Sequence, residues 1–232
     1  MKYKFIFDKE ISDSFIYLSD EEKRIVLATV LGTHCAIFYG HNPERLCEAI
    51  GRLTELDIKK VDCKNLPYSR EEKKSIVPQN GLLYCENFDF ADEEFKSIVE
   101  ESYRTLPIQV IATMTSVSDC ECSLFDYFDI FYKCKDNADS VFSKRMCMEV
   151  ISKAKYERSS WDSGQYTIGR ENSFKHIWYK QDVWETYKNS TPSLTTRRYM
   201  KISRSLSDID YSCCVRESHF IEAQKYCVYD NN

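Results

Sequence analysis

The sequence predicts an α/β fold, in which a parallel sheet has helices on both faces, followed by a small all-helical domain. Short apolar runs typical of buried strands alternate with amphipathic helical patterns in the first part of the chain. Beyond about Lys135 helical spacing replaces these runs. The composition, 43% hydrophobic and 14% aromatic, is that of a globular protein. We therefore expect an α/β core over residues 1–135 and a helical domain over residues 136–232.

The first elements surround a strand that ends in glycine. Residues 23–34 read as a helix stopped by Gly32. Cys35–Tyr39 reads as a buried strand that runs into Gly40. The next helix is indicated by apolar residues at helical spacing, namely Leu46, Ala49, Ile50 and Leu53.

The rest of the core contains three more predicted strands. A polar stretch over residues 57–80 leads to the first of them, Leu82–Cys85. Asp92 precedes a helix, and Pro107 ends it. The other two strands are predicted at Ile108–Met114 and Phe128–Tyr132.

Helical patterns dominate the second half. The first is a stripe made by Val141, Phe142, Met146, Val150 and Ile151. The last two helices are expected over Thr195–Asp210 and Val215–Tyr226.

Composition excludes several classes of protein. A formal charge of −5 argues against sequence-independent binding of nucleic acid by the whole surface, although a local basic patch is compatible with it. The 11 cysteines are odd in number and scattered, which favours reduced thiols over a disulfide scaffold. The charged start does not resemble a secretory signal, and no run approaches the ~20 apolar residues that span a bilayer. We expect a cytoplasmic protein without a membrane segment.

The connection after Gly40 lacks a phosphate-binding loop. A strand, a glycine and a helix are the setting in which backbone N–H groups and a lysine hold nucleotide phosphates. Here the connection, residues 41–45, reads His-Asn-Pro-Glu-Arg. It contains no G-K-[ST] and no second glycine, and it carries an acid where phosphate would lie.

Three segments resemble the magnesium-chelatase-like AAA+ family, which includes the ATPase subunit of magnesium chelatase and the competence helicase ComM. Residues 23–40 match the segment before its P-loop, with Lys23-Arg24, Gly32, His34 and Gly40 at the family's spacing. Residues 204–208, Arg-Ser-Leu-Ser-Asp, are similar to its R-T-I-A-D. Residues 215–226 are similar to its I-R-E-S-H-L-A-E-A-L-Q-Y. The resemblance implies an AAA+-like P-loop NTPase core followed by a helical lid domain.

The resemblance also assigns the nucleotide-binding positions. Gly40 matches the first P-loop glycine, whereas Pro43 and Glu44 stand about where lysine and threonine belong. Cys85 replaces the Walker B aspartate, and a thiol is a poor ligand for Mg²⁺. Glu86 falls at the water-activating glutamate, as a vestigial Walker B residue or as a chance acid at a strand end.

Three further positions complete the nucleotide site that the resemblance implies. Thr115 stands at the sensor asparagine, and Arg198 is the best match to the sensor-2 arginine. Tyr127 replaces the arginine finger and cannot neutralise developing phosphate charge. Gly40, Thr115 and Arg198 are therefore vestigial nucleotide-binding residues, and no catalytic residue is assigned.

The other candidate sites can also be explained by purely structural roles. The basic stripe of Arg197, Arg198, Lys201 and Arg204 is either a binding face or a solvated helix surface. His34 and His219 match family positions, and we expect packing or capping roles for them. A cysteine-rich stretch resembles the insertion of some relatives but has no evident fourth zinc ligand, so no metal is expected. It consists of Cys120, Glu121 and Cys122, with Cys134 later.

These observations lead to three functional hypotheses. The leading one is a non-catalytic, pseudo-ATPase scaffold or adaptor that contacts another AAA+ protomer or a different protein and needs no cofactor. The second is a residual ATPase that binds ATP and Mg²⁺ through Glu86, Thr115 and Arg198. The third is a DNA-associated module that uses the Arg197–Arg204 face.

Overall fold

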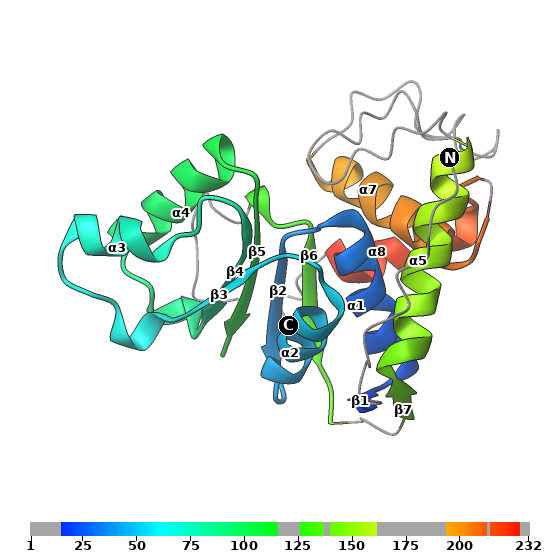
Figure 1. Ribbon diagram of the computed structural model, residues 1–232, viewed down its shortest axis with the longest axis horizontal. Helices are drawn as coiled ribbons and strands as arrows, with labels where there is room; N and C mark the ends of the chain where they lie inside the picture. The colour runs from blue at the N-terminus through cyan, green and yellow to red at the C-terminus, as the bar shows by residue number, and fades with distance from the viewer. Residues whose placement is uncertain (1–14, 116–125, 137–139, 162–193, 213, 228–232) are drawn as a thin grey trace.

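A parallel five-stranded sheet forms the centre of the molecule (Figure 1). The computed structural model describes residues 15–115, 126–136, 140–161, 194–212 and 214–227. The strand order is β3–β4–β5–β2–β6, and every neighbouring pair is parallel. The predicted α/β class is therefore confirmed. The strands are β2 (Ala36–Gly40), β3 (Ile58–Asp62), β4 (Gly81–Glu86), β5 (Ile108–Met114) and β6 (Ile130–Cys134).

Helices cover both faces because the central strands are apolar on both sides. Alternate residues of a strand point to opposite faces. Phe38 and Tyr84 accordingly join the apolar cluster beneath α1 (Asp20–Gly32) and α2 (Glu44–Leu53). Ile37 and Cys85 join the cluster on the other face, beneath α4 (Glu93–Thr105). On that side α3 (Arg70–Ile76) packs against α4.

The ends of α1 are defined by side-chain and backbone caps. Ser19 and Glu22 form a capping box at its start, which satisfies two backbone N–H groups. The helix ends at Thr33, which adopts a left-handed conformation with φ of 47°. Gln109 donates hydrogen bonds to the carbonyls of Thr29 and His34 at 3.2 and 2.8 Å. The last turn is thus anchored to β5.

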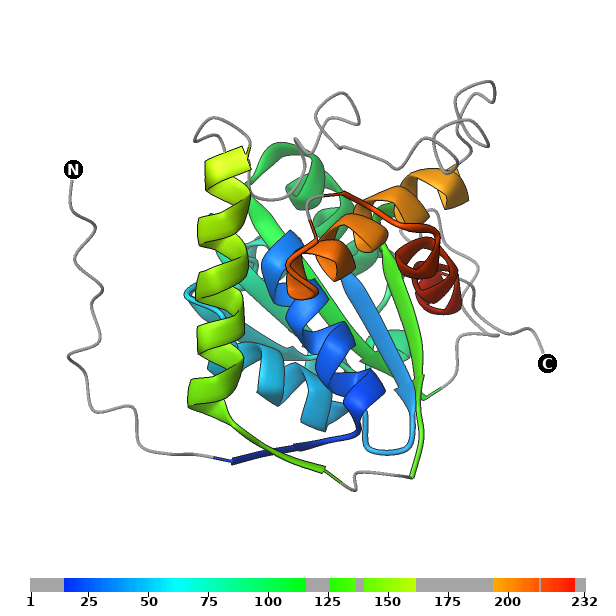
Figure 2. The ribbon, with the colours of Figure 1, turned by 90° about the vertical axis from the view of Figure 1, so that its right-hand side faces the viewer.

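The later helices pack on the α1 side of the sheet (Figure 2). They are α5 (Lys144–Trp161), α7 (Leu194–Ile209) and α8 (Glu217–Cys227). Apolar residues from all three belong to the same buried cluster as α1 and β2. The division of the chain into domains at Lys135 stays a prediction, and this cluster contains residues from both sides of it. No described helix combines the length and the apolar character that a membrane span requires.

A two-stranded antiparallel sheet lies apart from the main sheet. It pairs β1 (Phe15–Leu18) with β7 (Ser140–Ser143). The prediction that Val141 and Phe142 begin a helix is wrong, because both lie in β7 and α5 begins only at Lys144. The backbone partner of β7 comes from the distant β1, which local spacing could not reveal.

Two other elements escaped the sequence patterns. The polar stretch over residues 57–80 contains both β3 and α3. β3 is an edge strand in which Ile58 and Lys60, on one face, are exposed, so it lacks the apolar run of a buried strand. The last strand of the main sheet, β6, begins at Ile130 and ends at Cys134, two residues later than predicted at each end.

Candidate functional site

The connection between β2 and α2 is a tight turn of three residues, His41 to Pro43. Gly40 has a φ of +91°, and a Cβ there would lie 2.9 Å from the carbonyl oxygen of Cys134. The backbone N–H of His41 donates to the same carbonyl at 3.1 Å. Gly40 is therefore required by the close approach of β6. A loop of this length cannot supply the series of N–H groups that surrounds phosphates in a P-loop.

Arg45, in the first turn of α2, is bound within the chain at this end of the sheet. Its Nη2 atom pairs with Glu22 and donates to the carbonyl of Lys135 at 2.6 Å. The Glu22 side chain is only 1% exposed, so the guanidinium balances a buried charge. The first cation after the β2–α2 turn therefore joins α2, α1 and the chain after β6.

Glu86 lies at the carboxyl end of β4, as the resemblance requires, but other side chains hold it. Its Oε1 atom is 2.5 Å from Nζ of Lys60 on β3 and accepts a hydrogen bond from the Tyr84 hydroxyl at 3.1 Å. Its side chain is 20% exposed. Both contacts are made by Oε1, and they fix the carboxylate against β3 and β4.

Cys85 points to the opposite face and is fully buried. A hydrogen bond with Cys63 and burial hold the pKa of the Cys85 thiol well above its usual range. The thiol is therefore protonated at neutral pH, and a protonated, buried sulfur does not bind Mg²⁺. The position that the resemblance assigns to the Walker B aspartate therefore offers no oxygen ligand to a metal ion.

Thr115 and Tyr127 also contact their own chain. The backbone N–H of Thr115 donates to Asp89 at 3.3 Å. The Tyr127 hydroxyl accepts a hydrogen bond from Nε of Arg104 at 2.6 Å and donates to Glu100 at 3.2 Å. The Tyr127 ring packs against Tyr103, with 5.1 Å between the ring centroids. At the position that the resemblance assigns to the arginine finger, the aromatic side chain thus packs against α4.

The basic stripe of α7 is not a solvated face. Arg198 is 8% exposed, and its guanidinium lies 5.3 Å from the centroid of the Phe131 ring. Lys201 pairs with Asp129 at 3.0 Å. Arg204 is 2% exposed and pairs with the equally buried Asp208 at 3.1 Å. Both readings of the stripe assumed exposure, and these three side chains instead turn toward the protein. The side chain of Arg197 lies outside the described residues.

The residues that the resemblance assigns to nucleotide binding have different partners in the structure. Gly40 is paired with Cys134 at the carboxyl end of β6, whereas Arg198 lies over Phe131, three residues earlier. That separation is roughly 10 Å along the strand. Thr115 and Glu86 follow two other strands and contact different partners. Among the described residues, these four positions therefore have separate partners.

A different set of residues does converge, at the amino end of the sheet. His34 lies between two partners: its Nδ1 atom is 3.2 Å from Asp129, and its Nε2 atom is 2.9 Å from the Ser205 hydroxyl. All three side chains are buried. Burial opposes ionisation of Asp129, but His34 and Lys201 prevail and lower its pKa to about 2. We call these three hydrogen-bonded side chains the relay, and they join the end of α1, the start of β6 and α7.

Gly32 provides the space for this relay. A Cβ at Gly32 would lie 2.1 Å from Nε2 of His34 and 2.6 Å from Oγ of Ser205. The sequence suggested that Gly32 stops the helix, but Thr33 has the left-handed conformation that does so. Gly32 instead allows the close contact between α1 and α7.

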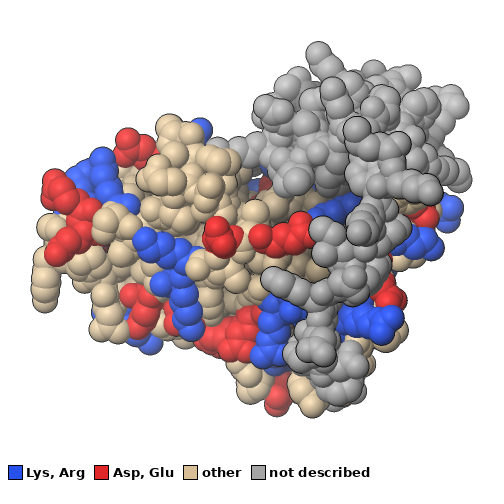
Figure 3. Space-filling model, in the orientation of Figure 1, with Lys and Arg blue, Asp and Glu red and all other residues tan. Residues whose placement is uncertain are grey.

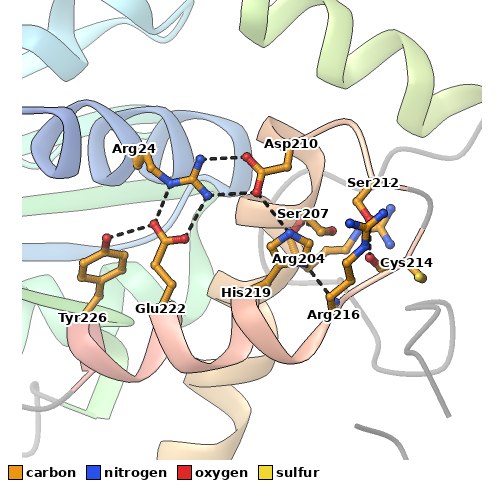
Figure 4. Close-up of polar contacts among 10 residues, drawn as sticks. All are labelled: Arg24, Arg204, Ser207, Asp210, Ser212, Cys214, Arg216, His219, Glu222 and Tyr226. Atoms are coloured by element: carbon orange, nitrogen blue, oxygen red, sulfur yellow. Dashed lines mark hydrogen bonds and ion pairs between the residues drawn. The ribbon is translucent and has the colours of Figure 1, made fainter. Parts of the chain in front are cut away.

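A second polar joint ties α1 to α8 (Figure 4). The Arg24 guanidinium donates to both oxygens of Glu222, at 2.7 and 2.9 Å, and to Asp210 at 2.7 Å. Asp210 also lies 3.1 Å from Nε2 of His219. His219 and Arg24 keep the pKa of Asp210 well below its usual range, against the opposing effect of burial.

His219 has a capping role, as the sequence suggested. Its Nδ1 atom accepts a hydrogen bond from the backbone N–H of Arg216 at 3.0 Å. The Nε2 atom therefore carries the proton that faces Asp210. In this way one histidine orders the start of α8 and completes the joint.

The family-like sequence segments thus meet in space. Arg24, Gly32 and His34 come from the first segment, Ser205 from the second, and His219 and Glu222 from the third. In the sequence these positions stand out only through the family resemblance, which gives them no common role. The available signal was that polar residues recur in segments otherwise typical of buried helices.

Metal ligation finds no support in the part of the chain that the structure describes. No group of three or more histidine, cysteine or acidic residues is arranged to hold an ion there. Eight described cysteines are free, and seven of them are buried. The cysteine-rich stretch at Cys120 and Cys122 lies outside the described residues.

The comparisons with known proteins show similarity of structure only. No known protein family matches the sequence, and no curated protein does. A candidate ATPase from Cytophaga hutchinsonii is 10% identical, with a TM-score of 0.48, over 88% of this chain and 79% of that one. RuvB from Thermotoga maritima is 11% identical, with a TM-score of 0.45, over 90% and 70%. An MCM homolog from Methanopyrus kandleri is 12% identical, with a TM-score of 0.47, over 88% and 53%. All three TM-scores lie below 0.5.

Proposed function

We propose that this chain is a non-catalytic, AAA+-like protein of the magnesium-chelatase type, which works as a scaffold or adaptor through contacts with other proteins. The observation that carries the proposal is Arg45. It stands directly after the lost P-loop, and its guanidinium is bound to Glu22 and to the Lys135 carbonyl rather than left for phosphate. Catalysis of phosphoryl transfer depends on cations placed around the phosphates, so this arrangement disfavours it.

The other active-site positions support the same conclusion. A protonated Cys85 replaces the metal-binding aspartate, and Tyr127 replaces the finger arginine. By contrast, the polar joints between α1, α7 and α8 are complete. A protein that keeps the contacts between its parts while losing its nucleotide chemistry is suited to act through its surface. On this proposal it needs neither ATP nor Mg²⁺ and works in the cytoplasm beside an AAA+ protomer or another protein.

A residual ATPase is the second candidate, and one observation favours it. Glu86 keeps a partly exposed carboxylate at the carboxyl end of β4, the edge at which open α/β sheets bind ligands. The DNA-associated alternative has weaker support. Arg198 and Arg204 are buried, and on the face drawn in Figure 3 basic and acidic side chains are interspersed rather than gathered by sign.

Titration of the purified protein with a fluorescent ATP analogue, with and without Mg²⁺, tests the proposal. We expect no saturable binding up to millimolar nucleotide and no hydrolysis above background. The matched variant is Glu86→Gln. If the protein is a scaffold, this substitution leaves nucleotide binding and hydrolysis unchanged. If the protein is a residual ATPase, the substitution abolishes hydrolysis but not nucleotide binding. Micromolar binding that requires Mg²⁺ would overturn the proposal.

The adaptor role needs a separate experiment. Affinity purification from the native host, followed by identification and reconstitution of the co-purifying protein, should yield a stoichiometric complex. Its formation should be independent of added ATP and EDTA. This part of the proposal would be contradicted if no protein co-purified in stoichiometric amount and none of the proteins tested formed a complex with the purified chain.

A further inference from the structure

We draw no further inference here: the strongest candidate, the buried Asp129–His34–Ser205 side-chain cluster between β6, α1 and α7, has the hydrogen-bond order of an activated nucleophile, but its three side chains are buried within the joint already described.

Discussion

Arg24 and Glu222 lie 198 residues apart in the chain and form a two-point ion pair, with Nε–Oε1 and Nη2–Oε2 distances of 2.7 and 2.9 Å. Bidentate pairs between arginine and a carboxylate are directional as well as strong. The Arg24 side chain is 29% exposed and that of Glu222 is 21% exposed, so solvent screens the pair only in part. This contact fixes the orientation of α8 against α1.

Replacing Arg24 tests how much this joint contributes to stability. Arg24→Ala removes hydrogen bonds to both Glu222 and Asp210, and we expect the free energy of unfolding to fall by about 2 kcal/mol. The control is Arg145→Ala, which removes an exposed pair with Glu149 within α5 and should change stability by less than about 0.5 kcal/mol. Urea denaturation followed by circular dichroism measures both. Equal effects of the two substitutions would show that the joint contributes nothing special.

A pair of glycine substitutions separates packing from helix propensity. In Gly32→Ala the added methyl group collides with His34 and Ser205, and we expect a loss of about 1–3 kcal/mol. In Gly51→Ala the methyl group meets only the tip of Ile58 at 3.1 Å, and alanine is the better helix former by about 1 kcal/mol. In a thermal melt, the midpoint temperature should therefore be lower than wild type for Gly32→Ala and equal to it or higher for Gly51→Ala. A harmless Gly32→Ala would contradict the close contact between α1 and α7.

The acid stability of the protein should depend on Asp129. Its pKa is about 2 in the folded protein, below the value near 3.9 of an unfolded chain. A lowered pKa gives stability that is present above pH ~4 and is lost as the pH falls toward 2. The size of this contribution is about 2.5 kcal/mol. In Asp129→Asn the free energy of unfolding should be lower at pH 7 and fall less steeply between pH 4 and 2.

The exposed Asp136 supplies the control for that experiment. Its side chain is 85% exposed, and Asp136→Asn should leave the acid dependence close to that of the wild type. Some acid dependence should persist in Asp129→Asn, because the pKa of Asp210 is also lowered. Parallel curves for wild type and Asp129→Asn would refute the role given to the relay.

Arg45 distinguishes a structural cation from a phosphate ligand. Arg45→Ala leaves the buried Glu22 carboxylate unpaired, and we expect a loss of about 3 kcal/mol or more. The double variant Glu22→Gln with Arg45→Ala contains no unpaired charge and should recover part of that loss. If Arg45 instead served phosphate, Arg45→Ala would weaken binding of the fluorescent ATP analogue while leaving the denaturation midpoint in place.

Much of the α/β core could be predicted from local pattern, since β2, β4 and β5 are apolar on both faces and their runs contrast with the neighbouring helices. β3 and β7 could not be predicted, because an exposed strand is recognised by its partner and not by its own residues. The basic stripe of α7 was misread for a similar reason. Charged residues at helical spacing usually indicate a solvent-exposed helix face. Here the cations instead contact Asp129, Asp208 and Phe131.

The sequence by itself determined the class of fold, the positions of the central strands and the missing phosphate loop, because each depends on residues close together in the chain. Only the tertiary structure decided what the remaining polar residues do. Asp129 and Ser205 lie 95 and 171 residues from His34 in the sequence, and no local pattern connects the three. Folding brings them together because burying any one alone would leave an unsatisfied polar group, whereas burying all three satisfies them.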